Sequence, residues 1–217
     1  MNYEQARFNM IEQQIRPWEV LDQTILDALG VVRREDYVPE RYRALAFADM
    51  EIPLGHGEAM MPPKLEARIL QEVAIGKTDT VLEVGTGSGY LTALAAHLGG
   101  HVYSVELVQE FSMQAADKLR AHGITNVTLE IGDAARGWSR HAPYDVVVVT
   151  GSMPVLPGGF AASLKPGGRL LAIVGDAPVM SARLVTCVSA GEYNAVDLFE
   201  TCVAPLRNAV QPERFVF

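Results

Sequence analysis

The stretch Val81-Leu82-Glu83-Val84-Gly85-Thr86-Gly87-Ser88-Gly89 decides the fold of this 217-residue chain. It begins within a short apolar run over residues 80–84, and residues 90–98 follow it with a helical pattern. Glycine is needed between the two because the backbone must turn sharply and can then approach a ligand without a Cβ in the way. The stretch therefore predicts a strand, a glycine-rich turn and a helix, the unit that forms a ligand site in open α/β sheets.

Strands and helices alternate downstream of this turn. The run Val146-Val147-Val148-Val149 is typical of a strand buried on both faces of a parallel sheet, and a similar run follows the turn at residues 165–168. Residues 108–121 form an expected helix. The expected strands cover residues 80–84, 101–105, 127–131, 146–149 and 170–174, with two more within 183–203. The alternation predicts an α/β fold with a doubly wound, mostly parallel, Rossmann-like sheet.

The chain before residue 77 has a helical pattern with interruptions. Phe8, Ile11 and Ile15 recur at helical spacing up to Pro17, and Asp22 is the expected N-cap of a second helix. A loop rich in glycine and proline covers residues 53–63, before a third helix over 65–73. We expect one domain over 1–217, in which residues 1–76 form a helical extension with the substrate loop and residues 77–217 form the cofactor-binding core.

Composition argues against several classes of protein. The net charge is −8, and no cluster of Lys and Arg offers a positive face for nucleic acid. Cys187 and Cys202 lack the spacing of metal ligands, and no metal site is predicted. No apolar run approaches the length of a membrane helix, and the first helical stretch lacks the apolar region of a signal peptide, so none is expected. A cytoplasmic protein without membrane or nucleic-acid partners is expected, and nothing predicts its oligomeric state.

The spacing of the loop glycines indicates which ligand it binds. Dinucleotide sites favour G-x-G-x-x-G, whereas this loop has glycines at 85, 87 and 89. Glu83 precedes them, and a carboxylate there would repel a pyrophosphate in a partly desolvated cleft. It suits a ligand that carries an ammonium and a sulfonium and no phosphate. The predicted cofactor is therefore S-adenosyl-L-methionine.

Two further carboxylates stand at the ends of the next two strands. Glu106 closes the second strand, at the position where an acidic side chain binds the ribose hydroxyls. Asp133 follows the third strand, where it could meet the adenine amino group. The predicted cofactor-binding set is Glu83, Gly85, Thr86, Gly87, Ser88, Gly89, Glu106, Leu107, Asp133 and Ala134.

Several segments, in order along nearly the whole chain, resemble the protein-L-isoaspartate O-methyltransferase family. Residues 32–39 are similar to its V-x-R-E-x-F-V-P element, residues 52–57 to its I-P-I-G-x-G segment, and residues 81–90 to its cofactor loop. The segments 164–168 and 203–206 also occur in the family's order. The resemblance implies methylation of carboxylates at isoaspartyl residues of damaged proteins or peptides, with S-adenosylmethionine as the methyl donor.

The sequence departs from the family in the loop that shapes the acceptor pocket. The resemblance aligns the family's Q-T-I-S-Q-P with residues 58–63, so Ala59 replaces a threonine and Met61 replaces the active-site serine. No catalytic residue is assigned. The substrate-loop candidates are His56, Gly57, Ala59 and Met61, and the predicted acceptor cleft contains Thr150, Gly151, Pro205 and Leu206.

The lost hydroxyls leave other functions open. A methionine-lined pocket would suit a small apolar or aromatic acceptor rather than an isoaspartyl peptide. The chain could also be a non-catalytic homologue that binds S-adenosylmethionine as a sensor or scaffold. An NAD-linked oxidoreductase is disfavoured by the glycine spacing and by Glu83.

Overall fold

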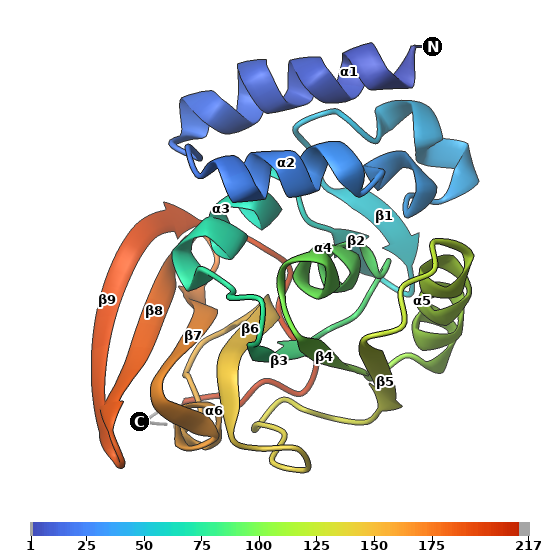
Figure 1. The fold of residues 1–217 in the computed structure, drawn as a ribbon. Coiled ribbons are helices and arrows are strands. Elements are labelled where there is room, and N and C mark those ends of the chain that lie inside the picture. The colour runs from blue at the N-terminus through green and yellow to red at the C-terminus, as the bar shows by residue number, and fades with distance from the viewer. Residues whose placement is uncertain (1, 213–217) are drawn as a thin grey trace.

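A seven-stranded sheet forms the centre of the molecule in the computed structural model, which describes residues 2–212 (Figure 1). Its strand order is β5-β4-β3-β6-β7-β8-β9. The strands are β3 (Thr80–Val84), β4 (His101–Glu106), β5 (Val127–Ile131), β6 (Tyr144–Met153), β7 (Leu164–Asp176), β8 (Val179–Ser189) and β9 (Glu192–Thr201). Neighbours from β5 to β7 pair in parallel, whereas β8 and β9 are antiparallel additions. The predicted α/β fold with a mostly parallel sheet is confirmed.

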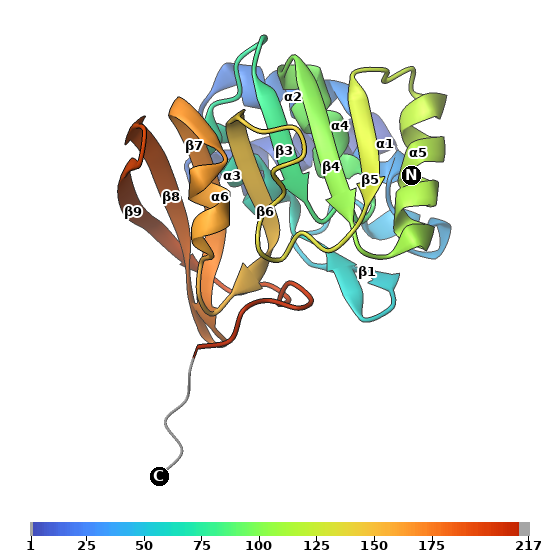
Figure 2. The ribbon, with the colours of Figure 1, turned by 90° about the horizontal axis from the view of Figure 1, so that it is seen from below.

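The valine run lies at the centre of the sheet and contacts both layers of helices. Val146 and Val148 belong to the apolar cluster shared with the N-terminal helices, whereas Val147 and Val149 belong to the opposite cluster. Figure 2 shows α6 in front of the sheet and α2, α3 and α4 behind it. The helices are α2 (Gln23–Val31), α3 (Pro63–Val73), α4 (Tyr90–Leu98), α5 (Gln109–Ala121) and α6 (Gly158–Ala162). None of the described helices has both the length and the apolar character needed to cross a membrane.

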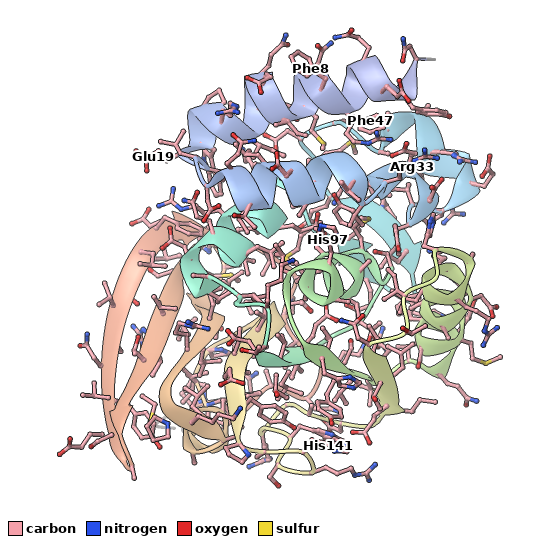
Figure 3. All side chains as sticks on the ribbon, in the orientation of Figure 1. Phe8, Glu19, Arg33, Phe47, His97 and His141 are labelled. Atoms are coloured by element: carbon pink, nitrogen blue, oxygen red, sulfur yellow. The ribbon has the colours of Figure 1, made fainter. Side chains whose placement is uncertain are left out.

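The N-terminal extension packs as helical layers above the sheet. It comprises α1 (Tyr3–Met10), a π-helix (Ile11–Ile15), α2 and three 3-10 helices, at Arg16–Trp18, Arg34–Asp36 and Glu40–Leu45. Asp22 is confirmed as the N-cap of α2, because its carboxylate accepts a 2.8 Å hydrogen bond from the Thr24 N–H. Phe8 corrects the predicted apolar face: it lies on the outside of α1, 58% exposed (Figure 3), and Met10 is buried there instead.

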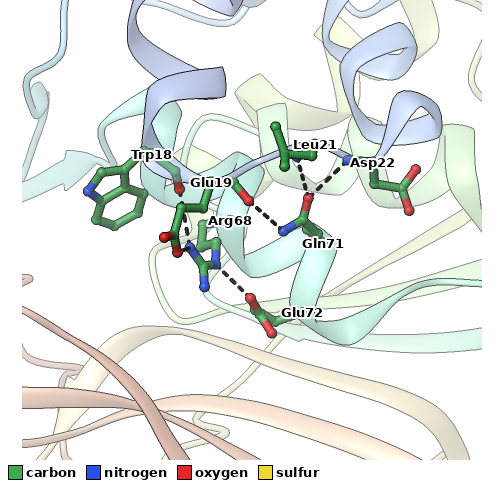
Figure 4. Close-up of polar contacts among 7 residues, drawn as sticks. All are labelled: Trp18, Glu19, Leu21, Asp22, Arg68, Gln71 and Glu72. Atoms are coloured by element: carbon green, nitrogen blue, oxygen red, sulfur yellow. Dashed lines mark hydrogen bonds and ion pairs between the residues drawn. The ribbon is translucent and has the colours of Figure 1, made fainter.

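Side chains of α3 hold the turn between the Arg16–Trp18 helix and α2 (Figure 4). Gln71 Oε1 accepts hydrogen bonds from the backbone N–H groups of Leu21 at 2.8 Å and Asp22 at 3.1 Å. Arg68 Nη1 donates to the carbonyl of Trp18 at 3.2 Å. Polar groups of α3 thus satisfy the backbone of the turn and hold the first helices of the extension against α3.

Three expected boundaries are corrected by the structure. The loop predicted over 53–63 contains a small antiparallel hairpin, β1 (Ile52–Gly55) and β2 (Glu58–Met60), with its tip at Gly55-His56-Gly57. The predicted turn at 165–168 lies inside β7, where the pairing with β6 shifts register. The first C-terminal strand begins at Val179 rather than near residue 183. In each case backbone pairing with another strand sets the boundary.

Candidate active site

A pocket lies at the carboxyl ends of the parallel strands, where ligands bind in open α/β sheets. Figure 2 shows the β1–β2 hairpin and the segment after β9 just beyond these strand ends. We call this cavity the pocket. Its lining comes from the hairpin and the residues around it (Glu51, Leu54, Glu58, Ala59, Met60, Met61, Glu66), the glycine turn (Glu83–Ser88 and Leu91), the ends of β4 and β5 (Val105–Val108, Phe111, Gly132–Ala135), and the later chain (Thr150, Gly151, Val203–Arg207).

The glycine turn is held closely against the end of β6. Gly85 has a φ of +97°, and a Cβ added there would lie 2.2 Å from the Thr150 hydroxyl oxygen. That hydroxyl donates to the carbonyls of Val84 and Gly85, at 2.9 and 3.0 Å. Position 85 therefore requires glycine, both for its backbone conformation and for this contact.

Glu83 lies buried beneath the turn. Its Oε2 accepts hydrogen bonds from the hydroxyls of Thr92 and Ser104, the latter at 2.6 Å. Its Oε1 is buried and has no hydrogen-bond partner among the described residues. Burial raises the pKa of Glu83 to about 8; the two hydroxyls oppose the rise, and the charge of Glu106 adds to it. The pocket thus contains a buried carboxylate oxygen without a hydrogen-bond donor. A bound cation would pair with this oxygen and keep the Glu83 carboxylate ionised.

Glu106 and Asp133 lie on the pocket wall after β4 and β5. Glu106 Oε2 accepts from the Gly87 N–H at 2.9 Å and its Oε1 from the Val108 N–H at 2.8 Å. Asp133 accepts from the Ala135 N–H at 3.0 Å and from the amide of Asn208 at 2.9 Å. Each carboxylate oxygen keeps capacity for a second donor. Within residues 2–212, no group of three or more His, Cys, Asp or Glu side chains could hold a metal ion.

S-adenosylmethionine fits these residues. The unpartnered Glu83 oxygen and the surrounding carboxylates suit a ligand that carries an ammonium and a sulfonium. Glu106 and Asp133 offer hydrogen-bond acceptors along one wall, and Gly85 and Gly87 of the turn present backbone without a side chain. The strand order together with this acidic, glycine-lined pocket defines an S-adenosylmethionine-dependent methyltransferase.

The substrate-loop candidates divide between the pocket and the hairpin tip. Ala59 and Met61 line the pocket, and the carbonyl of Met61 accepts a 2.6 Å hydrogen bond from Arg34 Nη2. His56 and Gly57 lie at the tip and are not among the lining residues. His56 Nε2 is 2.8 Å from a carboxylate oxygen of Glu110. His56 therefore contacts α5 and does not line the pocket.

The structure brings most of the other predicted residues together and adds new ones. All the predicted cofactor-binding residues line the pocket except Gly89, which packs against Ala115 as the N-cap residue of α4. Thr150, Gly151, Pro205 and Leu206 also line it. Sequence reasoning missed Glu66 and Arg207. Arg207 directly follows Leu206, a predicted residue of the acceptor cleft. Its positive charge next to that cleft was the signal that could have identified it.

Comparisons with known proteins agree with this fold and pocket. The family model for Protein-L-isoaspartate(D-aspartate) O-methyltransferase (PCMT) matches residues 5–207. A protein-L-isoaspartate O-methyltransferase of Opitutus terrae is 39% identical over 179 residues, which cover 81% of this chain and 77% of that protein. The chain belongs to the protein-L-isoaspartate(D-aspartate) O-methyltransferase family.

Solved structures show the same fold. A protein-L-isoaspartate O-methyltransferase aligns with a TM-score of 0.77 at 24% identity, over 94% of this chain and 65% of that one. This chain therefore spans about two thirds of that protein. A putative family member from Plasmodium falciparum, in complex with S-adenosyl-L-homocysteine, aligns with a TM-score of 0.77 at 18% identity, over 95% of this chain and 99% of that one.

Proposed function

We propose that this protein transfers the methyl group of S-adenosylmethionine to the free carboxylate of isoaspartyl residues in damaged proteins and peptides. The observation that carries the proposal is the family match over residues 5–207, which includes both the hairpin and the cofactor strands. Bound S-adenosylmethionine supplies an electrophilic methyl group on its sulfonium. A carboxylate acceptor is ionised at neutral pH and needs no general base, and the described residues that line the pocket include no histidine.

The chain's own residues have the tasks of binding and alignment. We propose that residues 77–217 form the cofactor-binding core, with Glu83, Glu106 and Asp133 holding the cofactor's polar groups. Residues 1–76 supply the extension and the acceptor hairpin. Thr150 and Gly151, with Pro205 and Leu206, border the acceptor cleft, where close placement of the reacting atoms accounts for much of the rate.

Methylation of a synthetic isoaspartyl peptide by the purified protein tests the proposal. We expect label from methyl-labelled S-adenosylmethionine in the isoaspartyl peptide and none in the same peptide with a normal aspartyl linkage. Isothermal titration calorimetry with S-adenosylhomocysteine checks that the cofactor site is intact. Tight S-adenosylhomocysteine binding without any peptide methylation would contradict the proposal.

A second candidate, a small apolar or aromatic acceptor, is favoured by the lining around the hairpin. Ala59, Met60 and Met61 all face the pocket, and no hydroxyl stands at position 59 or 61. A carboxylate that loses one neutral donor is bound less tightly by about 1–3 kcal/mol. The apolar lining would accept a flat, uncharged molecule without that cost.

Restoring the two hydroxyls tests whether their loss limits methylation of an isoaspartyl peptide. If the acceptor is an isoaspartyl peptide, Ala59→Thr with Met61→Ser is expected to raise kcat/KM for that peptide about tenfold or more, because each hydroxyl adds a hydrogen-bond donor. The matched control is Ala59→Val with Met61→Ala, which has similar shapes without hydroxyls. Equal kcat/KM in the two double variants would show that the hydroxyls do not limit this substrate.

A further inference from the structure

Arg207 is fixed at the mouth of the pocket by the backbone that precedes it. The segment after β9 crosses to the end of β6, where the Ser152 N–H donates to the Ala204 carbonyl at 3.0 Å and the Leu206 N–H donates to the Ser152 carbonyl at 2.8 Å. A Cβ on Gly151 would lie 2.8 Å from the Leu206 backbone nitrogen. The close approach places Arg207 one residue beyond a tightly held strand contact.

The Arg207 guanidinium reaches across to the hairpin. Its Nε donates to Glu58 Oε1 at 2.5 Å, and its Nη2 donates to the backbone carbonyl of His56. Nη1 has no hydrogen-bond partner within residues 2–212. The Arg207 and Glu58 side chains are 41% and 29% exposed, so the pair is accessible to an incoming ligand.

The charges of the lining make Arg207 distinctive. Six carboxylates line the pocket, and Arg207 is the only cationic side chain among the described lining residues. A carboxylate that enters an acidic pocket is repelled unless a cation compensates. Among these residues only Arg207 can supply that compensation.

Arg207 also contacts the residue next to a position that has lost a donor. Its partner Glu58 directly precedes Ala59, the position at which the family resemblance places a threonine. A guanidinium binds a carboxylate with charge-assisted hydrogen bonds, about twice as strong as those of a neutral hydroxyl. Its planar array of N–H groups can also engage both carboxylate oxygens.

We infer that Arg207 binds the carboxylate of the methyl acceptor, and that Glu58 is a stand-in carboxylate which the acceptor displaces. This inference rests on the proposed function, because it assigns a binding residue to a carboxylate acceptor. It also explains how an acidic pocket with Ala59 and Met61 retains a carboxylate substrate. Arg207 is a substrate-binding residue, and Glu58 competes with the substrate.

Neutral variants of the two residues are expected to have opposite effects. Arg207→Gln should raise KM for an isoaspartyl peptide about 10- to 100-fold, through loss of charged hydrogen bonds, and leave S-adenosylhomocysteine affinity unchanged. Glu58→Gln should lower KM about twofold to fivefold, because the competing carboxylate is gone. Arg207→Lys, which keeps the charge, should fall between wild type and Arg207→Gln. If the Arg207–Glu58 pair only held the hairpin in place, either neutral variant would break it. An equal rise of KM in Arg207→Gln and Glu58→Gln would therefore overturn the inference.

A binding measurement separates failure of this inference from failure of the proposed function. Fluorescence anisotropy gives the affinity of the S-adenosylhomocysteine-bound enzyme for the isoaspartyl peptide and for its methyl ester. Wild-type turnover with unchanged KM in Arg207→Gln overturns the role of Arg207 alone, whereas absent wild-type turnover overturns the proposed function. If the wild-type enzyme shows no turnover, the binding measurement still tests the role of Arg207. The role is supported if the enzyme binds the isoaspartyl peptide more tightly than its methyl ester and if Arg207→Gln loses this difference. Equal binding of the peptide and its methyl ester overturns it.

Discussion

Replacing Arg34 with methionine is expected to lower the free energy of unfolding by about 3–5 kcal/mol, because it leaves a buried carboxylate without its partner. Arg34 is fully buried and pairs through Nη1 with Glu66, which is 2% exposed. It also donates to the carbonyls of Ala46 at 2.9 Å and Met61 at 2.6 Å. Burial raises the pKa of Glu66, and the Arg34 charge opposes that rise. Urea unfolding followed by circular dichroism measures the loss.

Two controls identify the cause of this loss. Arg34→Met combined with Glu66→Met removes both charges and is expected to recover much of the stability, since no buried charge is left unpaired. Arg120→Met breaks the pair with Asp117, whose side chains are 78% and 76% exposed, and should cause no measurable change. If Arg34→Met is as stable as wild type, the buried pair contributes nothing to the fold.

The central sheet was predictable because its strands carry their signal locally. The strand over residues 80–84, the helix over 90–98 and the strand over 127–131 have the bounds that the sequence predicts. Val146 to Val149 are apolar on both faces because helices or loops cover both sides of β6. Burial in a parallel sheet leaves such runs in the sequence.

Features that depend on how one segment pairs or packs with another were not predictable. The β1–β2 hairpin lies in a stretch whose prolines and glycines indicate a loop, and only its backbone pairing makes it a sheet. Phe8 has helical spacing with its neighbours, but which side of α1 is buried depends on the packing of the extension.

The same division holds in the site. The carboxylates on β3 and β4 follow from their places at strand ends, whereas Arg207 reaches the pocket only because the chain after β9 crosses to β6. Glu66 is on α3, whose Pro63–Val73 pattern indicates a helix but gives no sign of a pocket below it. Local pattern therefore predicted the proposed cofactor side of the pocket better than its acceptor side.

Gly85→Ala is expected to weaken S-adenosylhomocysteine binding about 100-fold or more and to lower stability by about 2–5 kcal/mol. An alanine Cβ would lie 2.2 Å from the Thr150 hydroxyl oxygen, and the residue would need a φ of +97°. Relief of this clash requires either that the Thr150 side chain rotates and gives up its hydrogen bonds to the turn, or that the turn moves away from β6. Either change disturbs the backbone that we propose cradles the cofactor. Isothermal titration calorimetry and urea unfolding measure the two effects.

Gly123→Ala is the matched control for backbone strain. Gly123 has a φ of +68°, and a Cβ there meets nothing within 4 Å, so this variant should lose only about 1–2 kcal/mol and bind S-adenosylhomocysteine normally. Combining Gly85→Ala with Thr150→Ala removes the clashing oxygen and should restore part of the affinity. Normal S-adenosylhomocysteine binding by Gly85→Ala alone would show that the turn does not contact the cofactor closely. A rescue by Thr150→Ala, by contrast, would locate the effect in the contact between the glycine turn and β6, because the strain at position 85 is the same in both variants.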